Sequence, residues 1–176
     1  MKRKSLLLFI PILSILFFNS VANPPNGLKP VEPFDKEKYL GKWFEIARFD
    51  FTFEKDLNNT TATYSLNKNG TIKVENQGFN YKKNKWQKVI GKAKFAGSEN
   101  VGYLKVSFFG PFYSPYVVIA LDQDYKYALV AGGSLKLLWI LSREPTIPEN
   151  IKEQYLKIAQ SYGYDTSNLV WVEHNK

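Results

Sequence analysis

Apolar and polar residues alternate along most of this chain with a period of two. Eight segments carry this alternation, and residues that favour turns separate them: 43–49, 60–66, 71–79, 86–96, 103–109, 116–121, 127–131 and 135–142. Successive side chains of a strand point to opposite faces, so each segment predicts a β-strand with one apolar face. Between the second and third segments, Asn69-Gly70 supplies the positive φ angles that a tight hairpin turn requires.

The period changes to that of a helix near the C-terminus. Five apolar residues recur at helical spacing after Pro148, which suits a first helical turn: Ile151, Tyr155, Ile158, Ala159 and Tyr162. This pattern predicts a helix that ends at Gly163 and packs its apolar stripe on the outside of the sheet. A short helical turn capped by Asp35 and running to Leu40, and a last strand over 169–172, complete the predicted elements.

Eight antiparallel strands with short connections predict an all-β fold, of which an up-and-down barrel is the favoured form. A closed barrel leaves no free sheet edge and can hold one small ligand inside. A sandwich of two sheets remains the alternative, because the period of a strand does not report whether the sheet closes.

The first 22 residues have the features of a signal peptide. Lys2-Arg3-Lys4 precede an apolar run from Leu6 to Phe18, and Ser20-Val21-Ala22 resembles a cleavage site. An uncleaved anchor is the alternative. Residues 23–34, which contain four prolines, predict an extended lead-in, and 35–176 predict one domain. The sequence contains no cysteine, so we expect neither disulfides nor a lipid attached to a cysteine thiol.

The charge of the chain restricts the classes of partner. Without the three cations of the predicted signal peptide, the formal net charge falls from +8 to +5. This surplus favours peripheral contact with anionic phospholipid head groups, with a merely solvated basic surface as the alternative. The secretory signal and the lack of a basic helix disfavour nucleic acid. With His174 as the single histidine, we expect no enzyme chemistry, no metal and no cofactor.

Three motifs occur in order along the chain. Gly41-Lys42-Trp43 opens the first predicted strand, Asp122-Gln123-Asp124-Tyr125 forms the turn after the sixth, and Arg143 ends the eighth. Together they resemble the three motifs of the lipocalin family, and the stretches 105–112 and 138–147 resemble its bacterial branch. The resemblance covers about residues 34–172. It implies an eight-stranded barrel that binds a small hydrophobic ligand.

The resemblance also assigns roles to the motif residues and shows two departures. Trp43 and Arg143 are expected to stack at the closed end of the barrel, as a structural plug, with Gly41, Asp122 and Tyr125 as supporting motif residues. Most bacterial lipocalins of this branch carry an N-terminal lipidated cysteine, which this sequence lacks. Gln123 replaces the threonine that is usual in the second motif.

The plug sets the frame for a cavity. If Trp43 and Arg143 point inward, alternation turns Ala47 and Phe49, and Leu141 and Trp139, inward as well. Alignment with the bacterial branch adds further inward positions: Ala62, Tyr64, Val74, Asn76, Leu104, Val106, Phe108, Val118 and Ala120. We predict ligand contacts among these, above all Trp139, although each residue alone could be ordinary core.

At the open end, four aromatic residues are candidates for a gate: Phe51, Phe53, Phe112 and Tyr113. Of these, we predict Phe53 and Tyr113 as ligand contacts. Lys82, Lys83 and Lys85 would attract a phosphate at the mouth, or would simply face water. Alternation also turns Glu45 inward, and we expect a buried arginine or tyrosine network near the floor to hold it.

An apolar cup suits an acyl chain, whose burial contributes about 0.8 kcal/mol per CH₂. We therefore expect a carrier of fatty acids, phospholipids or lysophospholipids in the bacterial envelope, located in the periplasm, where it can associate with the outer membrane. A binder of a pigment or retinoid-like molecule is the alternative, and a lipocalin-fold enzyme is the least favoured. Homologues of the branch can pair, so a homodimer stays open.

Overall fold

The computed structural model describes residues 23–176, and the predicted signal peptide lies outside these residues. The helical elements are η1 (Pro25–Gly27), α1 (Lys36–Tyr39), α2 (Glu149–Ser161) and η2 (Thr166–Asn168). The strands are β1 (Gly41–Phe49), β2 (Leu57–Leu66), β3 (Ile72–Asn80), β4 (Lys85–Phe95), β5 (Tyr103–Ser107), β6 (Ser114–Leu121), β7 (Tyr127–Ala131), β8 (Leu138–Ser142) and β9 (Leu169–Trp171).

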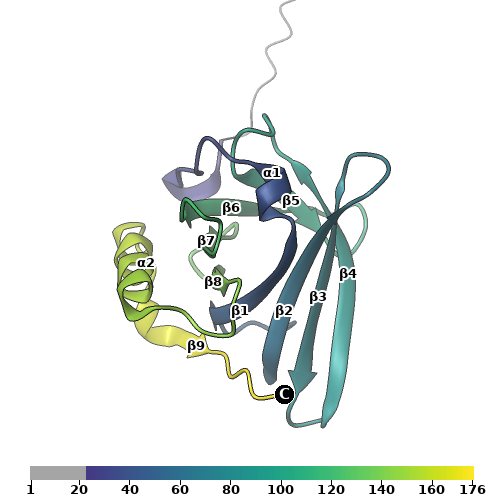
Figure 1. Cartoon of the computed structure of the whole chain (residues 1–176), viewed down its shortest axis with the longest axis vertical. Helices are drawn as coiled ribbons and strands as arrows, with labels where there is room; N and C mark the ends of the chain where they lie inside the picture. The colour runs from purple at the N-terminus through teal and green to yellow at the C-terminus, as the bar shows by residue number, and fades with distance from the viewer. Residues whose placement is uncertain (1–22) are drawn as a thin grey trace, which may run out of the picture.

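Strands β1 to β8 form a closed antiparallel barrel. Each strand pairs with the next along the chain, and β1 pairs with both β2 and β8, which closes the ring. The barrel, rather than a sandwich, is therefore confirmed, and all eight predicted strands are present (Figure 1). The helix α2 lies against the outside of this barrel and leads into β9, which pairs with the second half of β1.

Several strand bounds differ from the prediction, and at two of them a turn shortens the strand. β5 ends at Ser107 instead of 109, since the chain turns at the following residues, where the amide of Phe112 bonds to the carbonyl of Phe109. β8 begins at Leu138 instead of 135. The amide of Leu137 donates to the carbonyl of Ser134, so the first residues of the predicted strand form a turn instead.

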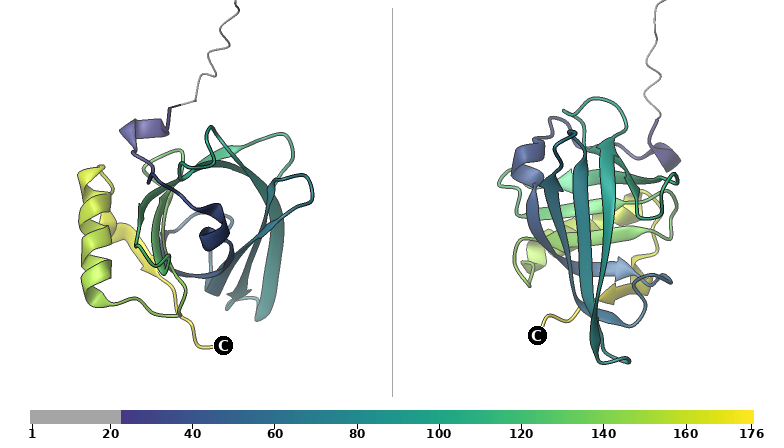
Figure 2. Two further views of the ribbon diagram at one scale, coloured as in Figure 1. Left: turned by 45° about the horizontal axis from the view of Figure 1, so that its top comes forward. Right: turned by 90° about the vertical axis from the view of Figure 1, so that its right-hand side faces the viewer.

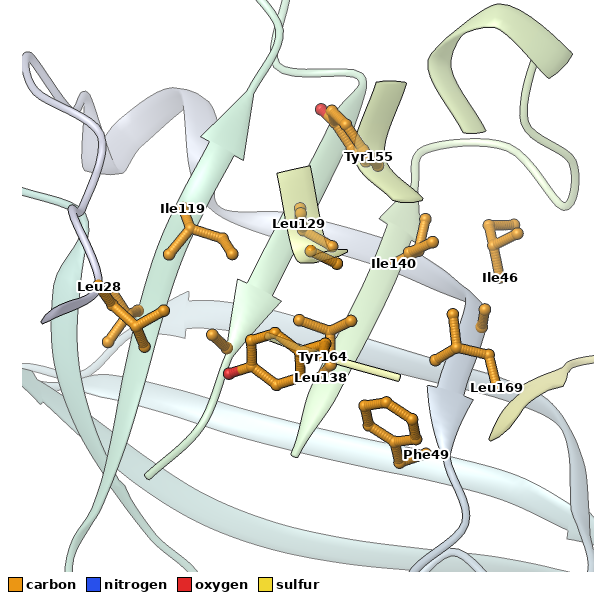
Figure 3. Packing of buried hydrophobic residues seen from close by; sticks show 14 of the residues in the cluster. Leu28, Ile46, Phe49, Ile119, Leu129, Leu138, Ile140, Tyr155, Tyr164 and Leu169 are labelled. Carbon is orange, nitrogen blue, oxygen red and sulfur yellow. The ribbon is translucent and has the colours of Figure 1, made fainter. Parts of the chain in front are cut away.

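The buried apolar residues form two clusters, one on each side of the barrel wall. The outer cluster lies between the wall and α2, where Tyr155 and Ala159 pack against residues such as Leu129 and Ile140 (Figure 3). The inner cluster fills the bore and includes Trp43, Ala62, Tyr64, Val74, Leu104, Val118 and Leu141. The predicted apolar stripe of the helix thus faces the wall.

A β-bulge in β1 decides which residues of this strand face the bore. Glu45 pairs with Leu141, but the next β8 residue, Ile140, pairs with Ala47, so β1 contains one extra residue. Beyond the bulge the alternation is shifted by one. Ala47 and Phe49 belong to the outer cluster, and the predicted inward orientation of both is therefore wrong. Arg48 takes the inward phase instead.

A second irregularity has the same effect in β6. Its pairing with β7 shifts between Val118 and Ala120. Val118 lies in the inner cluster as predicted, whereas Ala120 packs against the outer one. The inward prediction for Ala120 is thus also wrong.

A helix covers one end of the barrel, and loops surround the other. The short helix α1 lies across the bore at one end (Figure 2, left). The carboxylate of Asp35 caps this helix by accepting the amides of Glu37 and Lys38, as predicted. The loops after β1, β3, β5 and β7 lie at the opposite end, which is the mouth of the cup. Within residues 23–176, no helix has the length and apolar composition needed to cross a bilayer.

Candidate ligand-binding site

The floor of the cup is a stack of Arg143 on Trp43. The guanidinium carbon lies 3.8 Å from the centre of the indole ring, which confirms the predicted plug. Arg143 also donates to the backbone carbonyls of Lys38, Leu40 and Lys42 at 2.7–2.9 Å. These bonds tie the end of α1 and the start of β1 to the residue that follows β8.

The turn of the second motif is attached to the same floor. The Asp122 carboxylate accepts the amides of Asp124, Lys126 and Tyr127, so one aspartate holds the turn without a threonine hydroxyl. The carbonyl of Tyr125 accepts a bond from Nε of Arg143. At the start of β1, Gly41 has a φ of 95°, and a Cβ there would lie 3.4 Å from Nη1 of Arg143.

Three tyrosines form a polar cluster just inside the floor. The hydroxyl of Tyr116 lies 2.7 Å from that of Tyr39 and 2.9 Å from that of Tyr64. Burial raises the pKa of all three, so they are neutral donors and acceptors at physiological pH. The sequence reasoning missed Tyr39 and Tyr116. Extending the alternation of β6 back from Val118 by two residues would have found Tyr116.

A small cavity lies beside these tyrosines. Its volume is about 10 Å³, which is room for about one water molecule. Its walls are largely apolar and consist of Phe34, Lys36, Tyr39, Leu40, Tyr64, Ile72, Ala93, Leu104, Val106 and Tyr116. This cavity by itself is too small for an acyl chain.

Most predicted wall residues do share the bore. Ala62, Tyr64, Val74 and Val118 are buried in the inner cluster, and Val106, Phe108 and Trp139 pack against it while remaining half-buried. Asn76 follows Val74 on the inward phase of β3. Its side-chain oxygen is buried without a hydrogen-bond partner, which makes it an unused acceptor on the wall.

The aromatic residues of the mouth are arranged differently from the prediction. Phe51 packs edge-on against Trp139, with ring centres 5.9 Å apart, and Phe53 contacts both Phe51 and Phe109. Phe109 was missed because it was assigned to a strand. These rings form an aromatic lid, defined here as Phe51, Phe53 and Phe109, above Trp139. Phe53 is 70% exposed.

Two predicted gate residues do not belong to this lid. Tyr113 lies under the ammonium groups of Lys92 and Lys94, at 5.9 and 4.7 Å from its ring centre. These lysines flank the inward Ala93, so Tyr113 lies against the outer face of the wall and apart from the lid. Phe112 is 79% exposed. Among the rim lysines, Lys82 is paired with Asp56 at 3.0 Å.

The bore also contains a group of charged residues. Nη1 of Arg48 donates to Glu45 at 2.8 Å, and the Thr60 hydroxyl donates to the same oxygen at 3.1 Å. The prediction that a buried arginine holds Glu45 is confirmed. The partner lies on the side of the mouth rather than near the floor, because Nη2 of Arg48 donates to the carbonyls of Glu54, in the β1–β2 connection, and of Leu57, the first residue of β2.

Glu54 completes this charged group from above. Its Oε2 accepts a bond from Nε1 of Trp139 at 3.1 Å and lies 3.8 Å from Nε of Arg48. Burial, reinforced by the nearby charge of Glu45, raises the pKa of Glu54 to about 8. Arg48 and Glu54 were missed, since the bulge that turns Arg48 inward has no signal in the hydrophobic pattern.

A second, larger hollow lies outside the barrel. It has a volume of about 490 Å³ and is bounded by Phe49, Asp50, Leu135, Lys136, Asp165 and Asn168. Within the described residues, no group of three or more His, Cys, Asp or Glu side chains is arranged to hold a metal ion.

Residues 34–174 match the model of a family described as a lipocalin-like domain. The chain is 51% identical to the outer membrane lipoprotein Blc of Citrobacter freundii over 154 residues, which is 88% of this chain and 87% of the relative. The protein of the same name from Vibrio cholerae is 42% identical over 167 residues, covering 94% and 97% of the two chains. Temperature-induced lipocalin-1 of Arabidopsis thaliana is 36% identical over 81% of this chain and 80% of the relative.

Solved structures resemble the fold at lower identity. Insecticyanin of the tobacco hornworm Manduca sexta superposes with a TM-score of 0.68 at 20% identity, covering 85% of each chain. The cockroach allergen Per a 4 gives a TM-score of 0.65 at 22% identity, over 82% of this chain and 91% of the allergen. At such identities the likeness concerns the barrel alone.

Proposed function

This chain belongs to the lipocalin family, and we propose that it carries an acyl lipid in its barrel. Family membership makes it a lipocalin that binds small hydrophobic ligands, and its relatives are binding proteins rather than enzymes. The proposal specifies the ligand as a fatty acid, phospholipid or lysophospholipid, held for storage or transport in membrane maintenance.

The observation that carries the proposal is the apolar bore between the Trp43–Arg143 floor and the aromatic lid. Hydrocarbon needs no directional partner, and apolar walls stabilise it in proportion to the area removed from water. The lipid contacts we propose are the inward residues of the wall and the lid: Trp139, Tyr64, Ala62, Val74, Asn76, Val106, Phe108, Val118 and Phe53.

We place this activity in the bacterial envelope, where relatives of this chain are named outer membrane lipoproteins. The finer location is also a proposal: export by the N-terminal segment to the periplasm, with peripheral contact to the outer membrane. Because the sequence has no cysteine, we do not derive a thiol-linked anchor from the relatives' name.

Native mass spectrometry of the protein purified from a bacterial envelope, followed by lipid extraction, tests the proposal. We expect an acyl lipid at about one per chain. Val106→Trp should abolish this lipid by filling the bore, while Lys105→Trp on the adjacent position of β5 should retain it, provided that circular dichroism shows both folded. Recovery of a pigment without lipid, or equal lipid in both variants, would contradict the proposal.

A further inference from the structure

We propose that the Glu54 carboxyl group occupies the place beside Arg48 and Trp139 that the anionic head group of a bound lipid takes over. This inference rests on the proposed function and adds to it where the head group lies and what it must displace. The chemistry is that of a single anionic oxygen, from a carboxylate or a phosphate, on an amphiphile with an acyl chain.

Arg48 provides a fixed cation, and one of the three nitrogens of its guanidinium has no hydrogen-bond partner. Its side chain is 2% exposed, and its Nη1 and Nη2 are held by Glu45 and by the carbonyls of Glu54 and Leu57. Its Nε is buried and has no hydrogen-bond partner. A buried donor of a charged group without a partner is unfavourable, so an oxygen that reached Nε would gain a strong bond.

Glu54 occupies the place of that oxygen without completing the bond. Its Oε2 bonds to Trp139 at 3.1 Å, but at 3.8 Å from Nε of Arg48 it is too far for a hydrogen bond. Its own backbone carbonyl is fixed on Nη2 of Arg48 at 2.7 Å, which restricts how far the side chain can approach. A ligand oxygen has no such tether and can reach both donors.

The charges favour exchange over permanent pairing. Glu45 and Glu54 both face Arg48, and the contact with Glu45 is the shorter one, so Glu54 is the weaker partner of the guanidinium. Rotation of the Glu54 side chain toward the mouth would return it to water and open the path between the lid and Trp139. Phe51 packs edge-on against Trp139, whereas the other two lid residues, Phe53 and Phe109, are 70% and 61% exposed, so little buried area opposes this movement.

The arrangement sets the direction of the lipid in the cup. The head group lies beside Arg48 in the half near the mouth, and the acyl chain extends toward the tyrosines above the floor. The side chains there, including Val74, Leu104 and Val118, offer no charge to a hydrocarbon tail.

Displacement of the neutral fluorescent probe N-phenyl-1-naphthylamine measures this exchange with three ligands of equal chain length: palmitate, 1-palmitoyl-lysophosphatidate and palmityl alcohol. For the intact chain we expect the anionic ligands to bind more tightly than the alcohol. Glu54→Ala removes the resident carboxylate and should tighten the binding of the anions by about tenfold, while the alcohol changes by less than about twofold. Asp50→Ala, which removes an exposed charge from the same connection, is the matched control and should change neither.

Arg48→Gln should bring the affinity for the anions down to that for the alcohol. If this variant does not fold, Glu54→Ala still decides the question, since its side chain leaves the backbone contacts of the connection in place. Unchanged or weaker binding of the anions to Glu54→Ala would overturn the exchange, as would equal affinity of the intact chain for all three ligands. Binding of none of the three would overturn the proposed function as well. A larger response for palmitate or for the lysophosphatidate identifies a carboxylate or a phosphate as the head group.

Discussion

The two ends of the barrel differ in how completely their polar groups are satisfied. At the floor, every nitrogen of the Arg143 side chain donates to a backbone carbonyl, and the indole nitrogen of Trp43 donates to Tyr39. Toward the mouth, Nε of Arg48 has no partner, and Glu54 is a buried carboxyl whose pKa is raised to about 8. A complete network stabilises one arrangement, whereas an incomplete one can gain by accepting a ligand.

The first way to test this comparison is to truncate the tryptophan at each end. Trp43 is fully buried, so Trp43→Ala should lower the free energy of unfolding by about 3–5 kcal/mol. Trp139 is half-buried, and Trp139→Ala should lower it by less while weakening lipid binding. Urea denaturation gives both values. Equal losses of stability in the two variants would contradict the division between a structural floor and a binding mouth.

The second change concerns the arginine of the floor. Arg143→Lys keeps the positive charge, but an ammonium group lacks the planar set of donors that bonds to the carbonyls of Lys38, Leu40 and Lys42. We expect a loss of about 2 kcal/mol in stability, read from the denaturation midpoint, with unchanged affinity of the folded protein for palmitate. A specific loss of affinity at full stability would place the ligand at the floor instead.

The third test concerns how the free energy of unfolding depends on pH through Glu54. The pKa of Glu54 rises from 4.5 to about 8 on folding, so the folded state binds the proton more tightly than the unfolded chain. Its contribution to stability is complete below pH 4.5 and is lost as the pH rises through 8, at no more than about 1.4 kcal/mol per pH unit. Glu45 and Arg48 of β1 are the charged groups that face it, and the neutral Trp139 of β8 donates to it.

Glu54→Gln isolates this contribution, because the amide cannot titrate. The free energy of unfolding, measured from pH 5 to 8, should fall less steeply in Glu54→Gln than in the intact chain. Asp165→Asn, which alters a carboxyl on the outside whose pKa is lowered, should leave the slope over this range unchanged. Parallel slopes for the intact chain and Glu54→Gln would show that Glu54 does not carry a raised pKa.

The smallest expected effect is at the C-terminus, which closes the wall between the diverging halves of β1 and β2. His174 lies 2.9 Å from the carbonyl of Glu45, and Asn59 accepts the amides of Asn175 and Lys176. Deletion of these three residues should cost about 1–2 kcal/mol of stability. Lys36→Ala, which removes an exposed pair with Glu99, should change the stability less than this deletion does and serves as the control.

The sequence was sufficient to predict the barrel, the plug and most of the wall residues, since these predictions depend on the alternation of apolar residues and on the three motifs. Trp43 and Arg143 occupy the positions that their motifs imply, and Tyr64, Val74 and Val118 follow from the period of a strand. Such features repeat along a strand, and the hydrophobic pattern reports them directly.

The errors occur where one residue breaks the period. The bulge at Glu45 to Ala47 turned Phe49 outward and Arg48 inward, and a charged residue followed by an aromatic one gives no sign of such a shift. Tyr113 and Phe109 were misplaced because the path of a loop depends on contacts that are distant in sequence, here with Lys94 and Phe53. Arg48 and Glu54 were missed for these two reasons, because a bulge turns Arg48 inward and a loop carries Glu54.

The four tryptophans allow a direct test of where the lipid lies. Trp43 is at the floor and Trp139 below the lid, whereas Trp86 and Trp171 are 50% and 43% exposed on the outside. Stearic acid with a nitroxide near its carboxylate should broaden the indole N–H resonance of Trp139 most, and a nitroxide near its methyl end should broaden that of Trp43. Broadening confined to Trp86 or Trp171, or the reverse order inside the cup, would contradict a lipid held with its head group at the mouth.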